Sequence, residues 1–404
     1  MAMRVLLINH FPMTGSGSGV YVANVARELI ELGHQSMVLC PDTIAPEPDE
    51  YPFPVETITC PGPGRPEGAG KTSLSFPFPC FTTHPRSSRT FYALTESEIA
   101  EYVAVLEARA RRAAEGFKAD VIHAQHLWVT AAVARRAGRP YVVTSHGTDL
   151  LGYRADPRYR PFAHEGAEGA RQIIAVSQAT AREVVQTFGT SSDRLESLPN
   201  GVDGKRFRPL DVSRDEIFRE LKLPTPLGPV IIYAGKLACF KGSDVLIDAA
   251  SIYEMQLPTA TTLIVGEGAE RRALESMVRA LRLRGVHFIG FVDQTKLVRL
   301  YAAADVAVVP SREEPFGLAA LEAMACGLPV VASAVGGLTE YVDDTVGRLV
   351  PPDNPGALAY AIAEEIRLGG RKAKGAAAAA RGTTYSWRKH AERLVEVYAK
   401  AAGK

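Results

Sequence analysis

Two glutamates eight positions apart, Glu314 and Glu322, are well placed to bind one polar ligand. An apolar run at 305–310 predicts a buried strand, and a helix is predicted from Phe316 to the glycine at 327, so Glu314 lies in the loop between them. Glu322 is about 9 Å further along the helix axis than Phe316, at ~1.5 Å per residue. The first-turn N–H groups between the carboxylates carry partial positive charge. A ligand with hydroxyls at both ends and a phosphate between them fits, and a nucleotide sugar has that layout.

A second pair of charged residues follows the strand predicted at 230–233. Lys236 and Lys241 flank a loop there, and ligands bind at the carboxyl ends of strands in open α/β sheets. Two cations at that place could hold a diphosphate and stabilise its charge as it leaves. The plainer alternatives are two solvated lysines, a helix-capping Glu314 and a solvated Glu322.

A glycine-rich turn and a histidine are the other candidate site elements. Gly17, Ser18 and Gly19 come directly before a helix predicted at 22–32, where a bare backbone could approach a phosphate or sugar. The turn could equally serve only as a connection. His146 follows another predicted strand and stands beside a glycine, so we expect it to line a ligand site, although a lone histidine is more often structural.

The elements that must position these residues predict an α/β fold. Short apolar runs alternate with helical patterns along the chain, which is typical of parallel sheets. A chain of 404 residues favours two domains of about 200 residues each. Residues 41–89 are rich in Pro and Gly and carry little assignable structure, as in functional or disordered loops. Residues 369–375 combine glycine with basic residues and are expected to be exposed.

The composition argues against several classes of protein. A net charge of +1 and the lack of zinc-finger or RNP-like patterns argue against nucleic acid as a partner. Five cysteines without a Cys-x-x-Cys motif favour free thiols in a reducing compartment. The first strand-like run is too short for a signal peptide and no apolar run approaches 18 residues, so a cytoplasmic protein is expected. Basic residues at 109–118 and at 135–136 leave a peripheral membrane contact open, and a solvated helix face explains them as well.

The stretch from 311 to 330 resembles the signature of a known family. Its two glutamates are separated by seven residues, with Pro-Phe-Gly after Glu314, as in the retaining glycosyltransferases of family GT4. The Gly-Lys and Lys-Gly pairs around Lys236 and Lys241 and the His-Gly-Thr-Asp run at His146 also match, so the resemblance covers nearly the whole chain.

The resemblance implies the GT-B fold, in which two Rossmann-like domains with parallel sheets face each other across a cleft. The acceptor-side domain is expected at 1–204, the domain for the nucleotide-sugar donor at 205–384, and a last helix at 385–404 that crosses back to the first domain.

The resemblance also implies roles for individual residues. Glu314 would hold donor-sugar hydroxyls, Glu322 the ribose hydroxyls and the two lysines the diphosphate. The residues expected to bind the donor are Gly17, Ser18, Gly19, Lys236, Lys241, Phe291, Val292, Glu314, Phe316, Gly317, Leu318 and Glu322. Those expected to act in catalysis are His146, Glu314, Lys241 and Lys236. Tyr21 and Asp149 would meet the acceptor, with capping of the next helix as the alternative for Asp149.

The sequence therefore predicts a retaining glycosyltransferase that uses a nucleoside-diphosphate sugar, with UDP favoured, and an acceptor that the residues do not identify. There is no Asp-x-Asp motif, so neither a metal nor another cofactor is expected. The alternatives are a GDP-mannose or ADP-sugar enzyme, an inverting, phosphorylase or epimerase branch of the fold, and a nucleotide-sugar-binding protein without turnover. The glycine turn and the His146 segment also resemble N-acetylglucosaminyl-malate synthases, although the insert at 41–89 does not match. A homodimer is left open.

Overall fold

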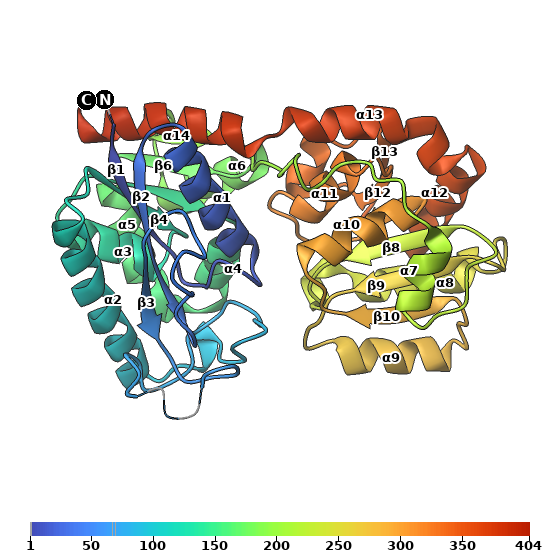
Figure 1. Cartoon of the computed structure of the whole chain (residues 1–404), viewed down its shortest axis with the longest axis horizontal. Helices are drawn as coiled ribbons and strands as arrows, with labels where there is room; N and C mark the ends of the chain where they lie inside the picture. Colours follow the sequence, from blue (N-terminus) through green and yellow to red (C-terminus); the bar gives the residue numbers. More distant parts are fainter. Residues whose placement is uncertain (1, 67, 69) are drawn as a thin grey trace. The chain divides into compact units, whose positions relative to one another are not determined.

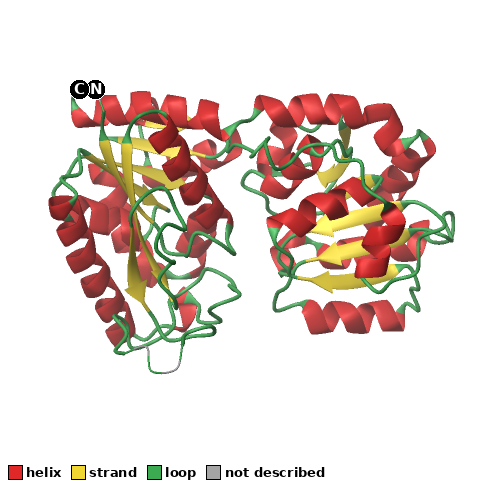
Figure 2. Cartoon of the chain, viewed as in Figure 1, coloured by secondary structure: helices red, strands yellow, loops and turns green. Residues whose placement is uncertain are grey.

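A computed structural model of the chain describes residues 2–66, 68 and 70–404 (Figure 1). Glu67 and Ala69, which belong to the Pro- and Gly-rich segment, lie outside the described residues. The chain divides into two compact units, Met1–Gly201 with Trp387–Lys404, and Val202–Ser386. Each unit contains a parallel sheet packed against helices (Figure 2), so the predicted α/β class with two Rossmann-like halves is confirmed.

The described residues of the first unit form a seven-stranded sheet in the order β3-β2-β1-β4-β5-β6-β7. Its strands are β1 (Arg4–Ile8), β2 (Gln35–Asp42), β3 (Val55–Thr59), β4 (Val121–Gln125), β5 (Tyr141–Ser145), β6 (Gln172–Ala175) and β7 (Leu195–Ser197). All neighbouring strands are parallel. The chain builds outward from β1 to β3 and then returns to β4 beside β1. The carboxyl ends of β1 and β4 therefore form the switch point at which such sheets bind ligands.

Helices of the first unit pack on this sheet. They are α1 (Gly17–Glu31), α2 (Glu96–Gly116), α3 (Val129–Arg136), α4 (Thr148–Ala155), α5 (Arg160–Gly169), α6 (Gln178–Phe188) and α14 (Trp387–Ala402). The C-terminal helix α14 packs against α1, β4 and β5. Asp120 accepts from the backbone N–H of Arg4 at 2.9 Å and from the Lys404 ammonium at 2.8 Å, which joins the two ends of the chain.

Helix α1 begins at Gly17, five residues before the predicted start at 22. Ser16 is the reason, because its hydroxyl accepts from the backbone N–H of Gly19 at 3.0 Å and caps the helix. A Cβ on Gly19 would lie 2.1 Å from the carbonyl oxygen of Pro12, so this close approach requires glycine. The glycine-rich turn is thus the first turn of a helix.

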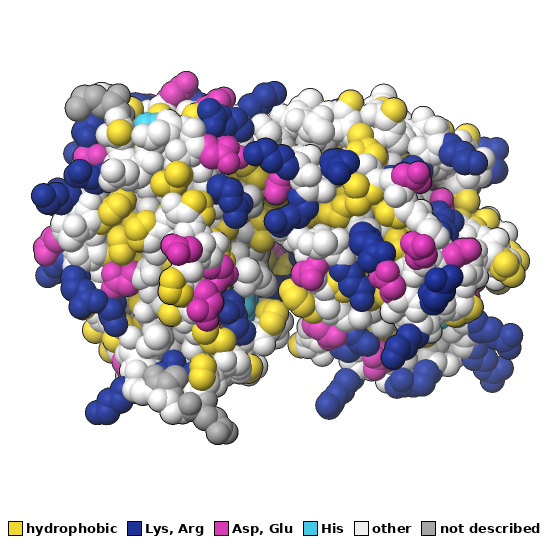
Figure 3. Space-filling model, in the orientation of Figure 1, with side chains coloured by type: hydrophobic (Ala, Val, Ile, Leu, Met, Phe, Trp, Pro, Cys, Tyr) yellow, Lys and Arg dark blue, Asp and Glu magenta, His cyan; other side chains and the backbone are white. Residues whose placement is uncertain are grey.

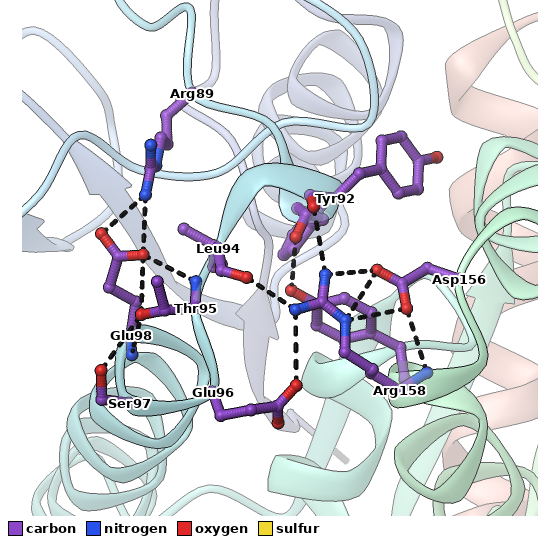
Figure 4. Close-up of polar contacts among 11 residues, drawn as sticks. Arg89, Tyr92, Leu94, Thr95, Glu96, Ser97, Glu98, Asp156 and Arg158 are labelled. Atoms are coloured by element: carbon purple, nitrogen blue, oxygen red, sulfur yellow. Dashed lines mark hydrogen bonds and ion pairs between the residues drawn. The ribbon is translucent and has the colours of Figure 1, made fainter.

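The segment 41–89 packs into the first unit. It contains β3, which the sequence did not predict, and it adds buried aromatic rings such as Phe78 to the core. Figure 4 shows how the chain is held after it: the Arg158 guanidinium donates to the carbonyl oxygens of Leu94 at 2.6 Å and Tyr92 at 3.1 Å. Thr95 begins α2 with a capping box, in which its side chain and that of Glu98 each bind the other's backbone N–H.

The described residues of the second unit form a six-stranded parallel sheet in the order β10-β9-β8-β11-β12-β13. Its strands are β8 (Val230–Ala234), β9 (Thr261–Val265), β10 (Val286–Gly290), β11 (Val306–Val309), β12 (Val330–Ser333) and β13 (Gly347–Val350). Its helices are α7 (Arg214–Glu220), α8 (Ser243–Tyr253), α9 (Arg271–Ala280), α10 (Gln294–Ala303), α11 (Leu318–Ala325), α12 (Pro355–Arg367) and α13 (Gly370–Thr384). Here the switch point lies between β8 and β11.

Helix α13 corrects part of the expectation that residues 369–375 are an exposed segment, since Lys372 and Ala373 are exposed but two of the glycines are not. Gly370 and Gly375 are buried, and α13 lies directly on α11, the helix that carries Glu322. A Cβ on Gly382 would lie 2.6 Å from the backbone nitrogen of Ala325 in α11. A glycine of α13 thus lets the two helices approach closely.

Replacing Gly382 by alanine should destabilise the protein. In a free helix this change adds about 1 kcal/mol of stability, but here the new methyl group meets backbone atoms, and overpacking of this kind costs ~1–3 kcal/mol. Urea denaturation followed by circular dichroism measures the change. Gly356→Ala is the matched control, because Gly356 is exposed in α12 and its nearest such neighbour is 3.6 Å away. A stabilised Gly382→Ala variant would contradict the close contact.

Candidate active site

Two loops meet at the switch point of the second unit. The loop after β8 ends in a short 3-10 helix, Cys239–Lys241, and the loop after β11 runs from Pro310. The backbone N–H of Arg312 donates to the carbonyl oxygen of Phe240 at 2.8 Å, which joins the loops. Gly242 has φ +65°, and a Cβ there would lie 2.0 Å from the carbonyl oxygen of Pro310. Only glycine permits this approach, which explains why a glycine follows Lys241.

Lys241 and Glu314 come together at this point. The Lys241 Nζ lies 2.7 Å from Glu314 Oε2, with side-chain exposures of 22% and 9%. The Ser311 hydroxyl donates to the same oxygen at 3.0 Å. Lys236 follows β8 in the same loop, and its carbonyl oxygen accepts from the Tyr233 hydroxyl at 2.7 Å. The pair leaves Glu314 Oε1 and two ammonium hydrogens of Lys241 available to a ligand.

Free backbone N–H groups lie next to this pair. Helix α11 begins at Leu318, two residues after the predicted start, with Gly317 as its N-cap at φ +96°. The Tyr341 hydroxyl holds the turn through the carbonyl oxygens of Phe316 at 2.9 Å and Gly317 at 2.8 Å. Within the described part of the chain, no acceptor is recorded for the N–H groups of Phe316, Gly317 and Leu318. Free N–H groups at a helix N-terminus can bind an anion.

Glu322 lies further along α11 in an apolar setting. Its carboxylate is half-buried, and no hydrogen bond to it is recorded among the described residues. Burial raises its pKa to about 8, and the nearby Arg206 guanidinium opposes that rise. Phe291, which is 60% exposed, and Val292 follow β10 in the same unit. An unpartnered carboxylate of this kind is ready to accept hydrogen bonds from ligand hydroxyls.

In the first unit, His146 follows β5 and is held by Gln125. Its Nε2 lies 2.9 Å from Gln125 Oε1, and the amide nitrogen of Gln125 donates to the carbonyl oxygen of His123 at 3.4 Å, which orients the amide. The Nε2 of His146 therefore carries the proton, and Nδ1 is free to accept a hydrogen bond. Burial lowers the pKa of His146 well below its usual value, with His126 and His390 adding to the effect, so the imidazole is neutral at pH 7.

The first turn of α1 carries the other residues predicted to bind the donor. In the described residues, no acceptor is recorded for the backbone N–H groups of Gly17 and Ser18. The N–H of Gly19 is already used by Ser16. Two of the three predicted positions therefore offer free donors at a helix N-terminus.

Tyr21 and Asp149, predicted to meet the acceptor, serve the core of the first unit instead. Both are fully buried. The Tyr21 hydroxyl lies 3.2 Å from Thr144 Oγ1 and 2.9 Å from His390 Nε2. Asp149 accepts from the backbone N–H groups of Leu127 at 2.7 Å and His146 at 3.1 Å. The structure thus contradicts direct contact with an acceptor, because neither side chain reaches the surface.

Replacing Asp149 by asparagine should lower the free energy of unfolding by about 2 kcal/mol, since hydrogen bonds to charged groups contribute ~1.5–3 kcal/mol. The new amide group also turns an N–H donor toward one of the two backbone donors. Urea denaturation measures the loss, with Glu115→Gln on the exposed face of α2 as control. Unchanged stability would contradict the structural role of this carboxylate.

His126 is a candidate positioning residue beside His146 that the sequence reasoning missed. It follows β4 at the switch point, is 1% exposed, and has the positive φ of +75° that is uncommon for a residue with a side chain. Its ring centroid lies 4.8 Å from that of His146, and its buried Nδ1 has no partner in the described structure. Such backbone strain clusters at functional sites. The available signal was a second histidine directly after the strand that ends at Gln125.

The basic stretches predicted to leave a membrane contact open are largely neutralised by ion pairs. Arg109 and Arg112 bind Glu56 at 3.0 and 3.1 Å, and Arg136 binds Glu165 at 2.6 Å. Acidic and basic side chains are interspersed on the face of the first unit drawn in Figure 3. In the residues described, no helix is both long and apolar enough to span a bilayer. The same residues contain no group of three or more His, Cys, Asp or Glu side chains placed to hold a metal ion.

Two family models match the chain. Residues 213–381 match the model described as "Glycosyl transferases group 1", and residues 15–206 match "Glycosyltransferase Family 4". A D-inositol 3-phosphate glycosyltransferase of Xylanimonas cellulosilytica is 32% identical over 96% of this chain and 93% of its own length. The enzyme of that name from Salinispora tropica is 31% identical over 97% of this chain and 83% of its own length.

Solved structures with the same fold include two from cyanobacterial sources. Sucrose-phosphate synthase from Thermosynechococcus elongatus superposes with a TM-score of 0.77 at 25% identity and covers 98% of both chains. Anabaena HepE in complex with UDP and glucose gives a TM-score of 0.73 at 24% identity, covering 98% of this chain and 99% of its own.

Proposed function

The chain belongs to glycosyltransferase family 4 and has the GT-B fold, and we propose that it is a retaining enzyme whose donor is a UDP-sugar. The observation that carries the proposal is the pair of Lys241 and Glu314 beside the free N–H groups at the start of α11. Cationic, anionic and amide groups at one switch point match the diphosphate and the hydroxyls of such a donor.

Lys241 and Glu314 bind different parts of the donor. The ammonium group keeps its contact with Glu314 and turns its other hydrogens to the diphosphate, while Glu314 Oε1 accepts from sugar hydroxyls. As the bond to the sugar breaks, negative charge grows on the leaving diphosphate. Lys241 and the N–H groups of α11 stabilise that charge where it develops.

Retention follows from attack on the same face that the leaving group departs from. The bond between the anomeric carbon and the phosphate oxygen breaks, the bond to the acceptor oxygen forms, and the acceptor's proton passes to the departing phosphate. His146 is neutral, so it is not the cationic acid of the reaction. Its free Nδ1 can accept a hydrogen bond from a substrate hydroxyl.

The reaction should not need a divalent metal. In this proposal Lys241 and the helix N–H groups supply the positive charge that a metal would otherwise bring to the diphosphate. Donor turnover in excess EDTA is therefore expected to equal turnover in added magnesium. Loss of activity in EDTA that returns on adding one metal would contradict this part of the proposal.

A panel of donors tests the function directly. UDP-, GDP- and ADP-sugars are titrated by calorimetry against the full chain, and hydrolysis of each is followed. UDP-sugars should bind selectively, Lys241→Ala should weaken that binding, and Lys372→Ala on the exposed face of α13 should not. Selective binding of a GDP- or ADP-sugar would change the nucleotide assigned to the donor. Binding of a donor without any turnover would favour a nucleotide-sugar-binding protein, and binding of no donor would overturn the proposal.

A further inference from the structure

A continuous chain of hydrogen bonds runs through the core of the first unit and has both of its ends on the C-terminal helix α14, which packs on α1 and β4 (Figure 1). His390 Nε2 lies 2.9 Å from the Tyr21 hydroxyl, which lies 3.2 Å from Thr144 Oγ1. Thr144 Oγ1 lies 2.7 Å from His123 Nε2, and His123 Nδ1 lies 2.6 Å from the Tyr398 hydroxyl. The five side chains are at most 3% exposed. Buried polar groups linked in this way hold one another in place.

The carbonyl oxygen of Pro199 determines where each hydrogen in this chain lies. It is 2.8 Å from His390 Nδ1 and can only accept, so Nδ1 carries a hydrogen. Burial lowers the pKa of His390 to about 4, so the ring is neutral at pH 7 and its Nε2 accepts from the Tyr21 hydroxyl. That hydroxyl has no second hydrogen, so Thr144 donates to it and accepts in turn from His123 Nε2. Burial also keeps His123 neutral, so its Nδ1 accepts from the tyrosine at the far end of the chain.

The ring of Tyr21 packs against the imidazole of His146. The two ring centroids are 5.0 Å apart at an interplanar angle of 83°, the T-shaped arrangement that aromatic pairs favour. Gln125 and His126 hold the same imidazole from the end of β4, through the hydrogen bond to Nε2 and a ring contact at 4.8 Å. Tyr21 comes from α1 instead, so the hydrogen bond to His390 helps to fix where its ring lies.

The two ends of the chain differ in what their loss would do to His146. Without His390, the Tyr21 hydroxyl would lose the acceptor of its only hydrogen, and a buried donor without a partner is unfavourable. The ring of Tyr21 would have to move to find another partner. Loss of the Tyr398 hydroxyl would leave every other hydrogen where it is, because that hydroxyl is itself the donor to His123.

We propose that His390, on the last helix of the chain, is a positioning residue for His146 and acts through Tyr21. The effect on the reaction rests on the proposed function, whereas the effect on the place of the imidazole does not. Tyr21, which the sequence assigned to the acceptor, would then serve the site from inside the core.

Nitrogen NMR of the full chain with labelled histidines tests the proposal, and His146→Gln assigns the signals of that residue. The parent should carry the hydrogen of His146 on Nε2. In His390→Leu the ring signals of His146 should shift, and kcat for donor hydrolysis should fall about 10-fold with little change in KM, since misplacing a site group by ~1 Å can cost up to ~10²-fold. Tyr21→Phe, which removes a single oxygen, should shift the same signals.

Tyr398→Phe is the matched control, because it removes one hydroxyl from the other end of the same chain. It should cost about as much stability as Tyr21→Phe but leave the His146 signals and kcat as in the parent. The double variant Tyr21→Phe/His390→Leu should lose no more activity than His390→Leu alone, because both residues act on His146 by one route.

Unchanged His146 signals in His390→Leu and Tyr21→Phe would overturn the proposal, and so would an equal shift in Tyr398→Phe. A hydrogen that moves from Nε2 to Nδ1 of His123, with His146 unchanged, would show that the chain reverses instead, and would also overturn it. If His390→Leu does not fold, Tyr21→Phe decides the result. Donor turnover with unmoved His146 signals would refute this inference alone, and moved signals in a protein that turns over no donor would refute the proposed function alone.

Discussion

Replacing Lys241 by alanine should lower kcat/KM for the donor by about 10³-fold, the upper range for removing one preorganised donor to a developing charge. The ammonium group lies 2.7 Å from Glu314 and next to free N–H groups, where the diphosphate is expected. Kinetics of donor hydrolysis measure the loss. An effect confined to KM would mean that Lys241 binds the donor equally well in the ground and transition states.

The same variant should also be less stable. Glu314 has a 9% exposed side chain and would lose its ion-pair partner, leaving only the Ser311 hydroxyl. Breaking a fully buried pair by removing one partner costs ~3–5 kcal/mol, and the 22% exposure of Lys241 reduces the expected cost to about 2 kcal/mol. Urea denaturation measures this value.

A double variant separates the two effects. Adding Glu314→Gln to Lys241→Ala removes the uncompensated charge, so stability should return to within about 0.5 kcal/mol of the parent. Activity should stay lost, because the cation for the diphosphate is still missing. Lys372→Ala, on the exposed face of α13, is the control for the loss of a lysine. Recovery of activity in the double variant would contradict the role given to Lys241.

Much of the sheet architecture was predictable from the sequence. Strands β5 and β10 have the predicted bounds, 141–145 and 286–290. Strand β5 is buried along its whole length, and such strands read as continuous apolar runs. The meeting of Lys241 with Glu314, 73 residues apart, also followed from the rule that ligand sites form where the order of strands reverses. The apolar pattern of the strands and the topology of the sheet were together sufficient to predict these features.

What the sequence could not predict depended on tertiary packing. The glycines at 369–375 suggested an exposed segment, but Gly370 and Gly375 are buried in α13. Burial, which no local pattern revealed, turned Tyr21 and Asp149 from surface candidates into core residues. The role suggested for His126 rests on its φ of +75° and on an unpartnered ring nitrogen, neither of which has a sequence signature.

Glu322→Gln should make the free protein more stable in mild alkali. The folded-state pKa of Glu322 is about 8, against ~4.3 in an unfolded chain. Between these values the folded protein holds a proton that the unfolded chain has lost, so the carboxyl group lowers the free energy of unfolding as pH rises from about 4.5 to 8. Glutamine has no such proton. The variant should therefore match the parent at pH 4.5 and exceed it by about 2 kcal/mol at pH 8.5. This value is kept below the full linkage energy because Glu322 is partly exposed.

The affinity of the parent protein for UDP should rise with pH, whereas its stability falls. If the ribose hydroxyls donate to Glu322, affinity should rise between pH 7 and 9 as the carboxylate forms, because hydrogen bonds to charged groups are worth about 1.5–3 kcal/mol. The glutamine variant should bind about 10-fold more weakly at pH 8.5, by the same principle, and show no rise with pH. Calorimetric titrations at four pH values measure both trends, and Asp344→Asn, in an exposed turn, is the control.

A variant that gains stability but loses affinity for UDP identifies a ligand-binding carboxylate rather than a structural one. A glutamate kept for the fold, such as the buried Glu365 with its 2.6 Å contact to Lys374, should lose stability when it becomes glutamine. Glu322 has no such partner among the described residues, so its burial is unfavourable until a ligand supplies the donors. Parallel losses of stability and affinity in Glu322→Gln would show that this carboxylate supports α11 rather than the nucleotide.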